Sequence, residues 1–440
     1  MEKKLINLPV PSELRESLQL TSGEINNIAV GKRVVRARIV EGSPNQNPTD
    51  NQTVYITDDL AAVLGLPART GLNITKTNKA LRLGPLVGVL AGRYSKERGS
   101  FGAQNTFFRS LLTSLRNLNG AGFVFCPQDI NGDRKSIHGY YISGKSDERW
   151  KRMYFPLPDV CYNRYFNDTG SVGSYHTIAL LARHGVKTFN NSIGSKWAVH
   201  RLLIQQSDIA PHLPETRLLE SSQVLTSMLK RYKEVYLKPP SGCKGNGIIR
   251  VTRKKGAYLV KTADRDKGFL CRSSQEILKK TRASMDCSMP LVQQSIRFTK
   301  NSRHIDFRVL VQKNRLNKWR VTGIAARVGA SGRITTNLHT GGKAQEPAAI
   351  LQDRGFDPRQ ISSICTQLEE MALRVAEIIA SKARALGELG LDFLIDTNGK
   401  VWFLEANPKP GRRAFSDISQ DIRKVAVSRP MEYACHLAGF

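Results

Sequence analysis

The sequence predicts a mixed α/β protein (α+β) that is built from about three domains. Its 440 residues exceed the size of one ordinary hydrophobic core, and 40% of them are hydrophobic, as in a typical globular protein. Short β-prone segments with turns between them fill residues 1–84, and a strand–helix–strand pattern begins residues 85–190. Strands and helices then mix over residues 191–440. We therefore expect three successive domains with these boundaries.

A small β-rich domain is predicted over residues 1–84. The β-prone runs are residues 27–30, 34–40, 53–57 and 71–75. A polar segment that contains proline, residues 42–51, separates two of these runs and has the composition of a turn. Short strands joined by turns predict one small sheet.

The second region, residues 85–190, begins with a βαβ pattern. The apolar run 85–90 predicts a buried strand, residues 105–118 predict a helix, and residues 122–127 predict the next strand. Two strands joined by a helix normally lie parallel in one sheet, with the helix across it. We expect an α/β domain here.

The clearest helix of the third region begins after Asp357. Asp357 is a good N-cap and Pro358 suits the first helical position. Apolar residues then recur at helical spacing toward Gly387: Ile361, Ile364, Leu368, Met371, Val375 and Ile378. Apolar residues at this spacing predict a buried face, so we assign them no role in a site.

A hairpin over residues 390–407 predicts a metal site. Asn398-Gly399 lies between two apolar, β-prone runs and predicts a two-residue turn. Paired residue numbers then sum to 797, which places Asp392 opposite Glu405, with Asn407 on the same face. Two carboxylates and an amide oxygen suit Mg²⁺ or Mn²⁺ that also holds nucleotide phosphates.

A surface hairpin with solvated acids is the alternative to this metal site. Like charges that face each other across two strands are destabilising unless something compensates them, which favours the metal. Asp396 also lies on this face, but four residues along a strand is on the order of 13 Å. We therefore leave Asp396 out of the predicted metal ligands.

A glycine-rich hairpin over residues 235–251 is a candidate phosphate site. Lys238 ends the incoming strand, and Gly242, Gly245 and Gly247 would let backbone amides approach a phosphate closely. The spacing fits neither a Walker loop nor a Rossmann turn, and no helix follows. An ordinary turn explains most such matches when they occur alone.

The net charge of +30 points to an anionic partner. Much of the excess of Lys and Arg lies between Lys230 and Arg333. Nucleic acid, an acidic peptide or another anionic polymer would fit such a charge, and solvated faces plus the cations of a nucleotide site are the alternative. The sequence contains no recognisable RNA-recognition motif or zinc finger, so nucleic acid has no motif in its support.

The cysteines and the apolar segments predict a cytoplasmic protein that does not enter a membrane. The seven cysteines are scattered without a Cys-x-x-Cys pair, which predicts reduced thiols and neither structural zinc nor disulfides. The first residues have no signal-peptide pattern. No segment approaches the roughly 18 consecutive apolar residues that a membrane span needs.

The order of these features resembles the ATP-grasp enzymes. The features are Lys196, Lys238 with its glycine-rich hairpin, the apolar strand 290–296 and the hairpin 390–407. Further segments are similar to the endospore coat-associated YheC/YheD branch of that superfamily: residues 83–90, 158–164, 213–216, 306–313 and 335–342. The resemblance is weakest in the first 80 residues. It implies an ATP-grasp domain over residues 191–440 with a flap subdomain at about 212–297, and a pre-ATP-grasp domain over residues 85–190.

The resemblance also implies roles for individual residues. Those implied for ATP binding are Lys196 and Lys238 at the phosphates, Gly242, Gly245 and Gly247 in the flap above them, and Gln293, Gln294 and Ile296 at adenine. Those implied for Mg²⁺ are Asp392, Glu405 and Asn407. Those implied for the reaction are Arg308 and Arg327, near the transferred phosphoryl group or an acceptor carboxylate, and Asn337 with Gly341-Gly342. For each arginine a surface ion pair is the alternative.

The function that the resemblance implies is an ATP-dependent carboxylate–amine ligase. In ATP-grasp ligases a carboxylate attacks the γ-phosphate, and an amine then displaces phosphate from the acylphosphate. The substrates would be ATP, a carboxylate and an amine, from an amino acid or a peptide. A second hypothesis is an ATP-binding assembly or regulatory protein of the spore coat, without ligase activity. A third, an enzyme that acts on nucleic acid or charged tRNA, has only the charge of +30 to support it.

Overall fold

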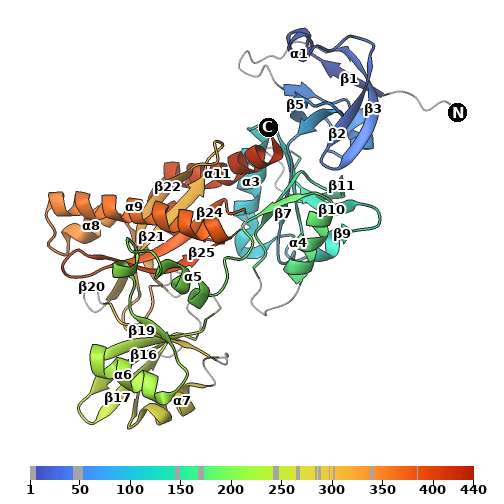
Figure 1. Cartoon of the computed structure of the whole chain (residues 1–440). Helices are drawn as coiled ribbons and strands as arrows, with labels where there is room; N and C mark the ends of the chain where they lie inside the picture. The colour runs from blue at the N-terminus through green and yellow to red at the C-terminus, as the bar shows by residue number, and fades with distance from the viewer. Residues whose placement is uncertain are drawn as a thin grey trace. The chain divides into compact units, whose positions relative to one another are not determined.

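The chain forms two compact units. The computed structural model describes residues 6–42, 53–143, 149–166, 173–240, 247–263, 268–282, 285, 289–296, 298–300, 303–336, 341–383 and 385–440. Unit 1 consists of Met1–Asn191, Lys313–Lys318 and Val427–Phe440, and unit 2 consists of Ser192–Gln312 and Trp319–Ala426. Each unit has its own cluster of buried hydrophobic side chains. Figure 1 shows the helices and strands that form the two units.

The first sheet of unit 1 contains the β-prone runs predicted near the N-terminus. Its strands, in spatial order, are β1 (Ile6–Val10), β3 (Arg33–Glu41), β2 (Ile25–Val30), β6 (Leu81–Gly84), β5 (Gly71–Lys76) and β4 (Thr53–Tyr55). Two short helices, α1 (Ser12–Ser17) and α2 (Asp58–Leu64), accompany them. The predicted strands are confirmed, and the two helices are additional features.

The second sheet of unit 1 confirms the predicted βαβ pattern. Its main strands, in spatial order, are β11 (Lys151–Pro156), β10 (Ser136–Tyr141), β8 (Ala121–Phe125), β7 (Leu86–Leu90), β12 (Val160–Asn163) and β13 (Lys187–Phe189), and β9 (Ile130–Asn131) pairs with β10. Strands β7 and β8 pair in parallel, and α3 (Asn105–Arg116) connects them. Helix α4 (Gly173–Arg183) precedes β13.

The end of the chain packs within unit 1. Helix α11 (Gln420–Ala438) contributes its last turns to this unit. Lys187 Nζ donates to the carbonyl of Leu437 at 2.6 Å, and Arg82 Nη2 donates to the carbonyl of Ala438 at 2.9 Å. The Arg82 guanidinium also lies over the ring of Phe440, 4.9 Å from its centre. Residues far apart in the sequence therefore contact one another within unit 1.

The first sheet of unit 2, which we call the flap sheet, is antiparallel. Its strands, in spatial order, are β14 (Thr216–Leu218), β19 (Leu291–Gln294), β15 (Glu234–Lys238), β16 (Ile249–Lys254), β17 (Ala257–Thr262) and β18 (Phe269–Cys271). Helices α6 (Ser222–Tyr232) and α7 (Ser274–Thr281) pack on one face of it. Because side chains alternate along a strand, Tyr236, Lys238 and Arg250 lie on the opposite face.

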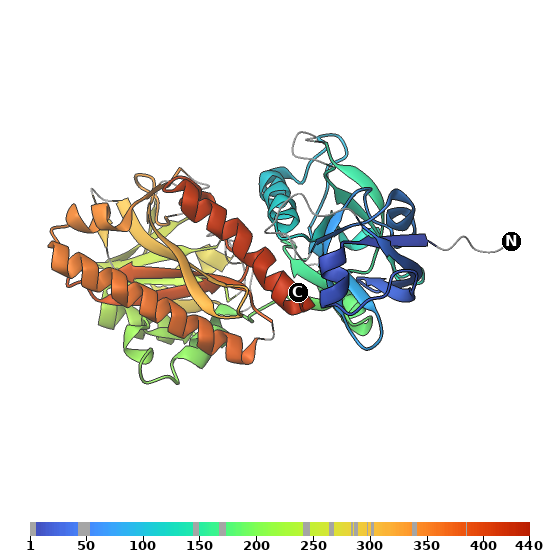
Figure 2. The same cartoon turned by 90° about the horizontal axis from the view of Figure 1, so that it is seen from above.

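The second sheet of unit 2, which we call the hairpin sheet, has the order β23 (Lys343–Gln345), β22 (Trp319–Val328), β21 (Arg303–Lys313), β24 (Glu388–Ile395) and β25 (Val401–Asn407). Strand β20 (Thr299–Lys300) pairs with β21. The helices of this part are α5 (Lys196–Leu203), α8 (Pro347–Gln352), α9 (Pro358–Lys382) and α10 (Arg413–Ser416). Figure 2 shows the long α9 lying along the hairpin sheet.

Helix α9 begins where its sequence predicts. Asp357 Oδ1 accepts hydrogen bonds from the backbone N–H groups of Arg359 and Gln360, at 2.8 and 2.9 Å. Gln360 Oε1 accepts from the Asp357 N–H in return, which completes a capping box. The predicted apolar face packs in the core of unit 2. Within the part of the chain that the structure describes, no helix is long and apolar enough to cross a membrane.

Candidate functional site

The β24–β25 hairpin places Asp392 directly opposite Glu405, as predicted. The predicted reason was wrong in part. Ile395 pairs with Val401, and the Asp396 N–H donates to the Lys400 carbonyl, so the turn is one residue longer than the two-residue turn Asn398-Gly399. A β-bulge between Asp392 and Phe393 in the register then shifts the pairing by one residue and restores the predicted partners.

Asp396 holds the turn of this hairpin. Its Oδ1 accepts from the backbone N–H groups of Asn398 and Lys400, at 2.9 and 3.1 Å, and its Oδ2 accepts from Trp402 Nε1 at 2.9 Å. These bonds occupy the carboxylate at the turn, away from Asp392. Leaving Asp396 out of the metal ligands agrees with this arrangement.

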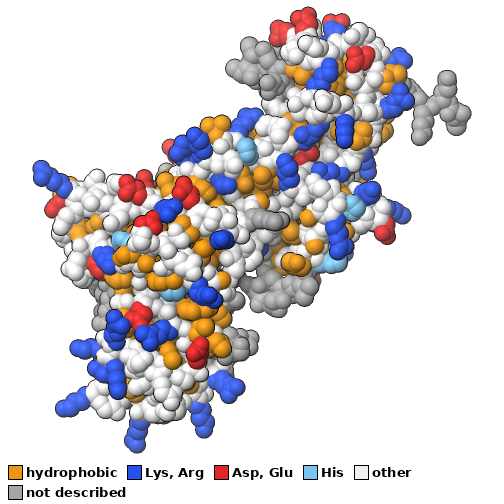
Figure 3. Space-filling view, viewed as in Figure 1, with side chains coloured by type: hydrophobic (Ala, Val, Ile, Leu, Met, Phe, Trp, Pro, Cys, Tyr) orange, Lys and Arg blue, Asp and Glu red, His pale blue; other side chains and the backbone are white. Residues whose placement is uncertain are grey.

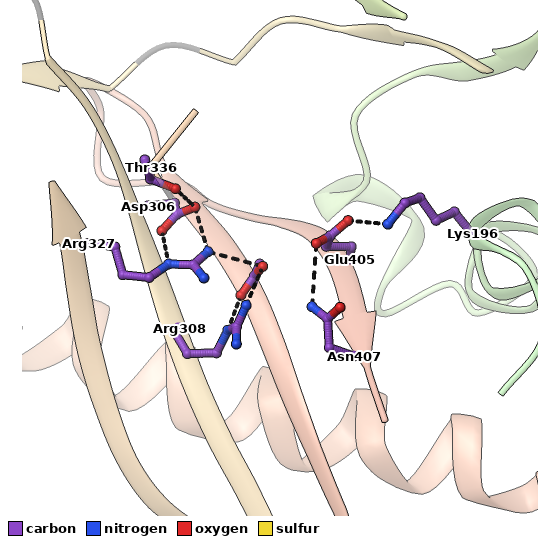
Figure 4. Close-up of polar contacts among 8 residues, drawn as sticks. Lys196, Asp306, Arg308, Arg327, Thr336, Glu405 and Asn407 are labelled. Carbon is purple, nitrogen blue, oxygen red and sulfur yellow. Dashed lines mark hydrogen bonds and ion pairs between the residues drawn. The ribbon is translucent and has the colours of Figure 1, made fainter. Parts of the chain in front are cut away.

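A chain of ion pairs crosses the hairpin sheet beside Asp392 (Figure 4). Arg308 on β21 donates to both carboxylate oxygens of Asp392, through Nε and, at 2.9 Å, through Nη2. Arg327 on β22 contacts Asp392 Oδ2 at 3.0 Å and donates twice to Asp306, at 2.6 Å for each bond. The hydroxyl of Thr336 donates to Asp306 as well. These contacts fix both guanidinium groups in place.

The two aspartates keep Arg327 charged. Burial acts to lower the pKa of Arg327, but the charges of Asp306 and Asp392 outweigh it and raise the pKa of Arg327 above its ordinary value. Only about a tenth of the side chains of Arg327 and Arg308 is exposed, 12% in each case. Buried guanidinium groups of this kind are rigid and permanently charged, which suits the binding of planar or tetrahedral oxyanions.

Glu405 connects the hairpin to helix α5. Lys196, the first residue of α5, donates to Glu405 Oε2, and Asn407 Nδ2 donates to Glu405 Oε1 at 3.4 Å. Burial acts to raise the pKa of Glu405, but the charges of Lys196 and Lys238 outweigh it and lower the pKa of Glu405 far below its ordinary value. Glu405 is therefore ionised at neutral pH.

Lys238 and Gln293 meet on the helix-free face of the flap sheet. Lys238 Nζ donates to Gln293 Oε1 at 2.6 Å, and Gln293 Nε2 donates to the hydroxyl of Thr216 at 3.0 Å. Burial lowers the pKa of Lys238 to about 8, although Glu405 acts in the opposite direction. Lys238 is thus a cation that loses its proton under mildly alkaline conditions.

The remaining predicted residues have varied positions. Gln294 Oε1 accepts from the Glu215 N–H, and the Gln294 N–H donates to the Glu215 carbonyl. Ile296 is half-buried, and Gly247 has a positive φ of 73°, which favours glycine. Gly242, Gly245 and Asn337 lie outside the described residues.

Sequence reasoning missed four residues of this region: Arg250, His304, Asp306 and Thr336. Asp306 accepts from Arg327 and Thr336, as described above. Arg250 Nη1 and His304 Nε2 lie 2.8 Å apart. The alternation along β21 could have revealed two of them, because His304 and Asp306 share a face with Arg308. Nothing in the local sequence signals Arg250 or Thr336.

The oxygen donors fit a divalent cation that is also held by phosphates. Within the described residues no group of three or more His, Cys, Asp and Glu side chains could hold a metal ion. An ionised carboxylate offers about four acceptor positions. Glu405 accepts two of the bonds given above and Asp392 accepts three, so both retain room. Two carboxylates and the Asn407 amide oxygen match Mg²⁺ with its other positions left to phosphate and water.

The fold and these residues together define an ATP-grasp protein. The family described as YheC/D like ATP-grasp matches residues 185–437, which is more than half of the chain. The endospore coat-associated protein YheD of Bacillus subtilis (strain 168) is 31% identical over 440 residues, which cover 98% of this chain and 93% of that protein. The chain therefore belongs to the YheC/D-like ATP-grasp family, and the predicted family and fold class are confirmed.

Other proteins are similar at greater distance. The endospore coat-associated protein YheC of the same organism is 25% identical over 324 residues, 72% of this chain and 88% of that protein. A RimK domain ATP-grasp protein of Sphaerobacter thermophilus DSM 20745 has a TM-score of 0.43 at 16% identity, over 79% of this chain and 98% of its own. D-alanyl-alanine synthetase A of Vibrio cholerae O1 has a TM-score of 0.46 at 11% identity, over the same two shares. At such scores these two structures support no further conclusion.

Proposed function

We propose that this protein is an ATP-dependent ligase that joins the carboxylate of an amino acid or peptide to an amine, through an acylphosphate. One observation carries the proposal: four cations of unit 2 surround a set of adjacent oxygen donors. The cations are Lys196, Lys238, Arg308 and Arg327, and the donors are Asp392, Glu405 and Asn407. Such a set suits Mg-ATP, and it supplies positioning and charge for phosphoryl transfer.

The charges favour a nucleotide triphosphate. The four cations exceed the carboxylates of Asp306, Asp392 and Glu405 by one positive charge. A bound divalent cation would add two more, so the site would attract the roughly four negative charges of ATP. In this proposal Lys196 and Lys238 contact the phosphates, and Gln293, Gln294 and Ile296 lie toward adenine. Gly247 would lie in the flap over the phosphates, and Gly242 and Gly245, which are outside the described residues, keep the same role in the proposal.

Glu405, Asn407 and Asp392 would hold Mg²⁺ or Mn²⁺. A bound divalent cation there would neutralise charge on the β- and γ-phosphates. Within the described residues Glu405 has more free acceptor positions than Asp392, because it accepts bonds from Lys196 and Asn407, whereas Asp392 accepts three bonds from Arg308 and Arg327. Asp392 is held by Arg308 and Arg327 and would keep these guanidinium groups next to the transferred phosphate.

The proposed reaction has two steps. An oxygen of the substrate carboxylate attacks the γ-phosphorus of ATP, the bond from that phosphorus to the β-γ bridging oxygen breaks, and ADP leaves with the bonding electrons. The amine nitrogen then attacks the acyl carbon, the carbon–oxygen bond breaks, and inorganic phosphate and a proton leave as the amide forms. Arg308, Arg327 and Asn337 would stabilise the negative charge that develops on the transferred group.

Hydroxylamine trapping tests this function directly. The protein is supplied with Mg-ATP, hydroxylamine and pools of amino acids or acidic peptides, and both ADP and hydroxamate are measured. Hydroxamate that forms with one pool identifies an acylphosphate and the class of the carboxylate. ADP release without hydroxamate in any pool, when the Glu405→Gln protein releases none, would contradict the acylphosphate and leave only an ATPase.

We expect Glu405→Gln to lower magnesium-dependent ATP turnover at least about 100-fold, because the amide is a poor metal ligand and its loss of charge frees Lys196. Turnover is followed by ADP release, and folding by circular dichroism and thermal unfolding. The matched control is Glu370→Gln on the exposed face of α9, which should behave as the wild type. Normal turnover in a folded Glu405→Gln protein would refute the metal assignment.

A second candidate function is an assembly or regulatory protein of the spore coat that binds ATP without forming a bond. The two Bacillus subtilis relatives are named endospore coat-associated proteins, which favours this candidate. Tight Mg-ATP binding without ADP release in any pool would support this candidate over the ligase. As a ligase the protein is expected in the cytoplasm, and as an assembly protein it is expected in the spore coat. Fractionation of sporulating cells would distinguish these two locations.

An anionic carboxylate substrate would fit the surface of the flap sheet. Between residues 214 and 296 the sequence has 17 Lys and Arg against 7 Asp and Glu. Exposed cations at the end of α6 and at the β16–β17 turn include Lys230, Arg253, Lys254 and Lys255. Figure 3 shows many Lys and Arg side chains over the part of the molecule that carries α6, α7 and β17. This surface would draw acidic substrates toward unit 2.

A further inference from the structure

Arg250 lies at the middle of the flap sheet, on the face opposite to α6 and α7. It pairs with Tyr236 across β15 and β16, and Tyr236 pairs with Gln293 on β19. Its neighbours Ile249 and Val251 point the other way, into the buried cluster with the helices. Lys238 is two residues from Tyr236 on the same face, so Arg250 and Lys238 are diagonal neighbours about 7–8 Å apart at their backbones.

His304 holds Arg250 from the hairpin sheet. It lies on β21, two residues before Asp306 and four before Arg308, on the same face. Arg250 Nη1 is 2.8 Å from His304 Nε2. A guanidinium group can only donate, so Nε2 must accept and His304 is neutral, with its proton on Nδ1. The histidine orients the guanidinium group and leaves its charge in place.

Among the described residues, Glu234 is the carboxylate near Arg250, and it does not hydrogen-bond to the guanidinium group. Glu234 Oε2 is 3.9 Å from Arg250 Nε, which is too long for a hydrogen bond. That carboxylate accepts instead from the hydroxyl groups of Thr252, at 2.6 Å, and Ser295, at 2.9 Å. Within the described residues, Arg250 Nε is buried and makes no hydrogen bond. A buried donor of a charged group without an acceptor is costly, and a ligand would satisfy it.

We propose that Arg250, oriented by His304, binds an oxyanion of a ligand. The oxyanion is either a phosphate of the nucleotide or a carboxylate of the second substrate, and both suit the planar, doubly donating edge of a guanidinium group. The proposal rests on the proposed function, because it adds a binding contact to the same site. Arg250 is a diagonal neighbour of Lys238 on the flap sheet. His304 lies on β21, the strand that also carries Asp306 and Arg308.

The test compares Arg250→Gln with Arg253→Gln. Arg253 is on the same strand but exposed, so its variant makes the same change in net charge without touching the site. Calorimetric titrations use sodium tripolyphosphate, citrate and adenosine with the full chain at fixed salt. We expect Arg250→Gln to lower the affinity for at least one of the two oxyanions about tenfold or more and to leave the affinity for adenosine unchanged. Arg253→Gln should bind all three ligands with the affinity of the wild type.

The two sources of oxyanion give different results. Loss of tripolyphosphate affinity places Arg250 at the nucleotide phosphates, and loss of citrate affinity alone places it at the carboxylate of the second substrate. Thermal unfolding checks that each variant is folded. If Arg250→Gln is unfolded, Arg250→Lys carries the test, because it keeps the charge and loses the paired donors, and a weakening of about threefold or more is expected.

Three results would overturn the proposal. They are unchanged affinity of a folded Arg250 variant for both oxyanions, an equal loss in Arg253→Gln, and no binding of either oxyanion by the wild type. Mg-ATP binding by the wild type is measured in parallel. Its absence would contradict the proposed function, whereas normal Mg-ATP binding with an unaffected Arg250 variant contradicts only the role of Arg250.

Discussion

Lys238 is the residue whose environment makes the clearest prediction about binding. Its pKa lies at about 8, because burial lowers it and the attraction of Glu405 offsets burial only in part. Below this pH the side chain is charged and attracts phosphate, and above it the side chain becomes neutral. A bound phosphate would favour the charged form and raise the pKa of Lys238 in the complex.

We therefore expect the affinity for Mg-ATP to be nearly constant below pH 7 and to fall above pH 8, by at most about tenfold per pH unit. Calorimetry at pH 7, 8 and 9 measures the fall, and two buffers of different ionisation enthalpy measure the proton uptake. Lys238→Arg keeps its charge throughout this range and should flatten the profile. The same slope in both proteins would show that another group titrates.

At the scale of the element, the β24–β25 hairpin depends on Asp396. Three donors bind its carboxylate, and together they hold the turn that brings Asp392 opposite Glu405. Gly399 in this turn has a φ of 83°, which an L-residue with a side chain adopts only with strain. Local bonds at the turn therefore support the strand pairing of Asp392 and Glu405, the proposed metal ligands, at the other end of the hairpin.

We expect Asp396→Ala to destabilise unit 2 by about 1–3 kcal/mol, because three donors, two of them half-buried, lose their acceptor. Asp396→Asn retains one oxygen for the two backbone donors and should lose less. The free energy of unfolding is measured by urea denaturation, followed by tryptophan fluorescence and circular dichroism. Equal stability of the alanine and asparagine variants would argue against a capping role for the carboxylate.

At the scale of the whole molecule, the chain returns to unit 1 at its end. Lys187, Arg82 and Phe189 contact residues of the last turns of α11, and Phe440 lies under the Arg82 guanidinium group. The last residues are thus part of the packing of the first two sheets, although they follow the hairpin sheet in sequence. Stability of unit 1 therefore depends on the opposite end of the chain.

Deletion of residues 434–440 should loosen β6 and β13, because it removes the Ala438 carbonyl that accepts from Arg82, the Leu437 carbonyl that accepts from Lys187, and the ring of Phe440. Faster amide hydrogen exchange in peptides that contain Leu81–Gly84 and Lys187–Phe189 is the expected result. The single change Phe440→Ala removes only the ring and should lower the free energy of unfolding of unit 1 by about 1 kcal/mol. Unchanged protection in the deletion protein would contradict this view of the C-terminus.

Local sequence signals predicted the elements of the fold well and the site in part. The helix after Asp357, the strand–helix–strand pattern from residue 85 and the glycine-rich hairpin depend on neighbouring residues, and all are present where the structure describes them. The sequence predicted the cross-strand pair of Asp392 and Glu405 from a turn that is one residue too short. The β-bulge between Asp392 and Phe393 shifts the register by one residue and restores this pair. A bulge has no reliable sequence signal, so this agreement was partly accidental.

The sequence by itself determined the helix after Asp357, the strand–helix–strand pattern from residue 85, and the family to which the chain belongs. Only the tertiary structure decided which polar side chains meet: Lys196 and Glu405 are 209 residues apart, Arg308 and Asp392 are 84 apart, and Arg250 and His304 are 54 apart. The physical reason is that hydrogen bonds within a turn or a helix cap depend on adjacent residues. Ion pairs between strands depend on how separate segments pack, and no local pattern records that packing.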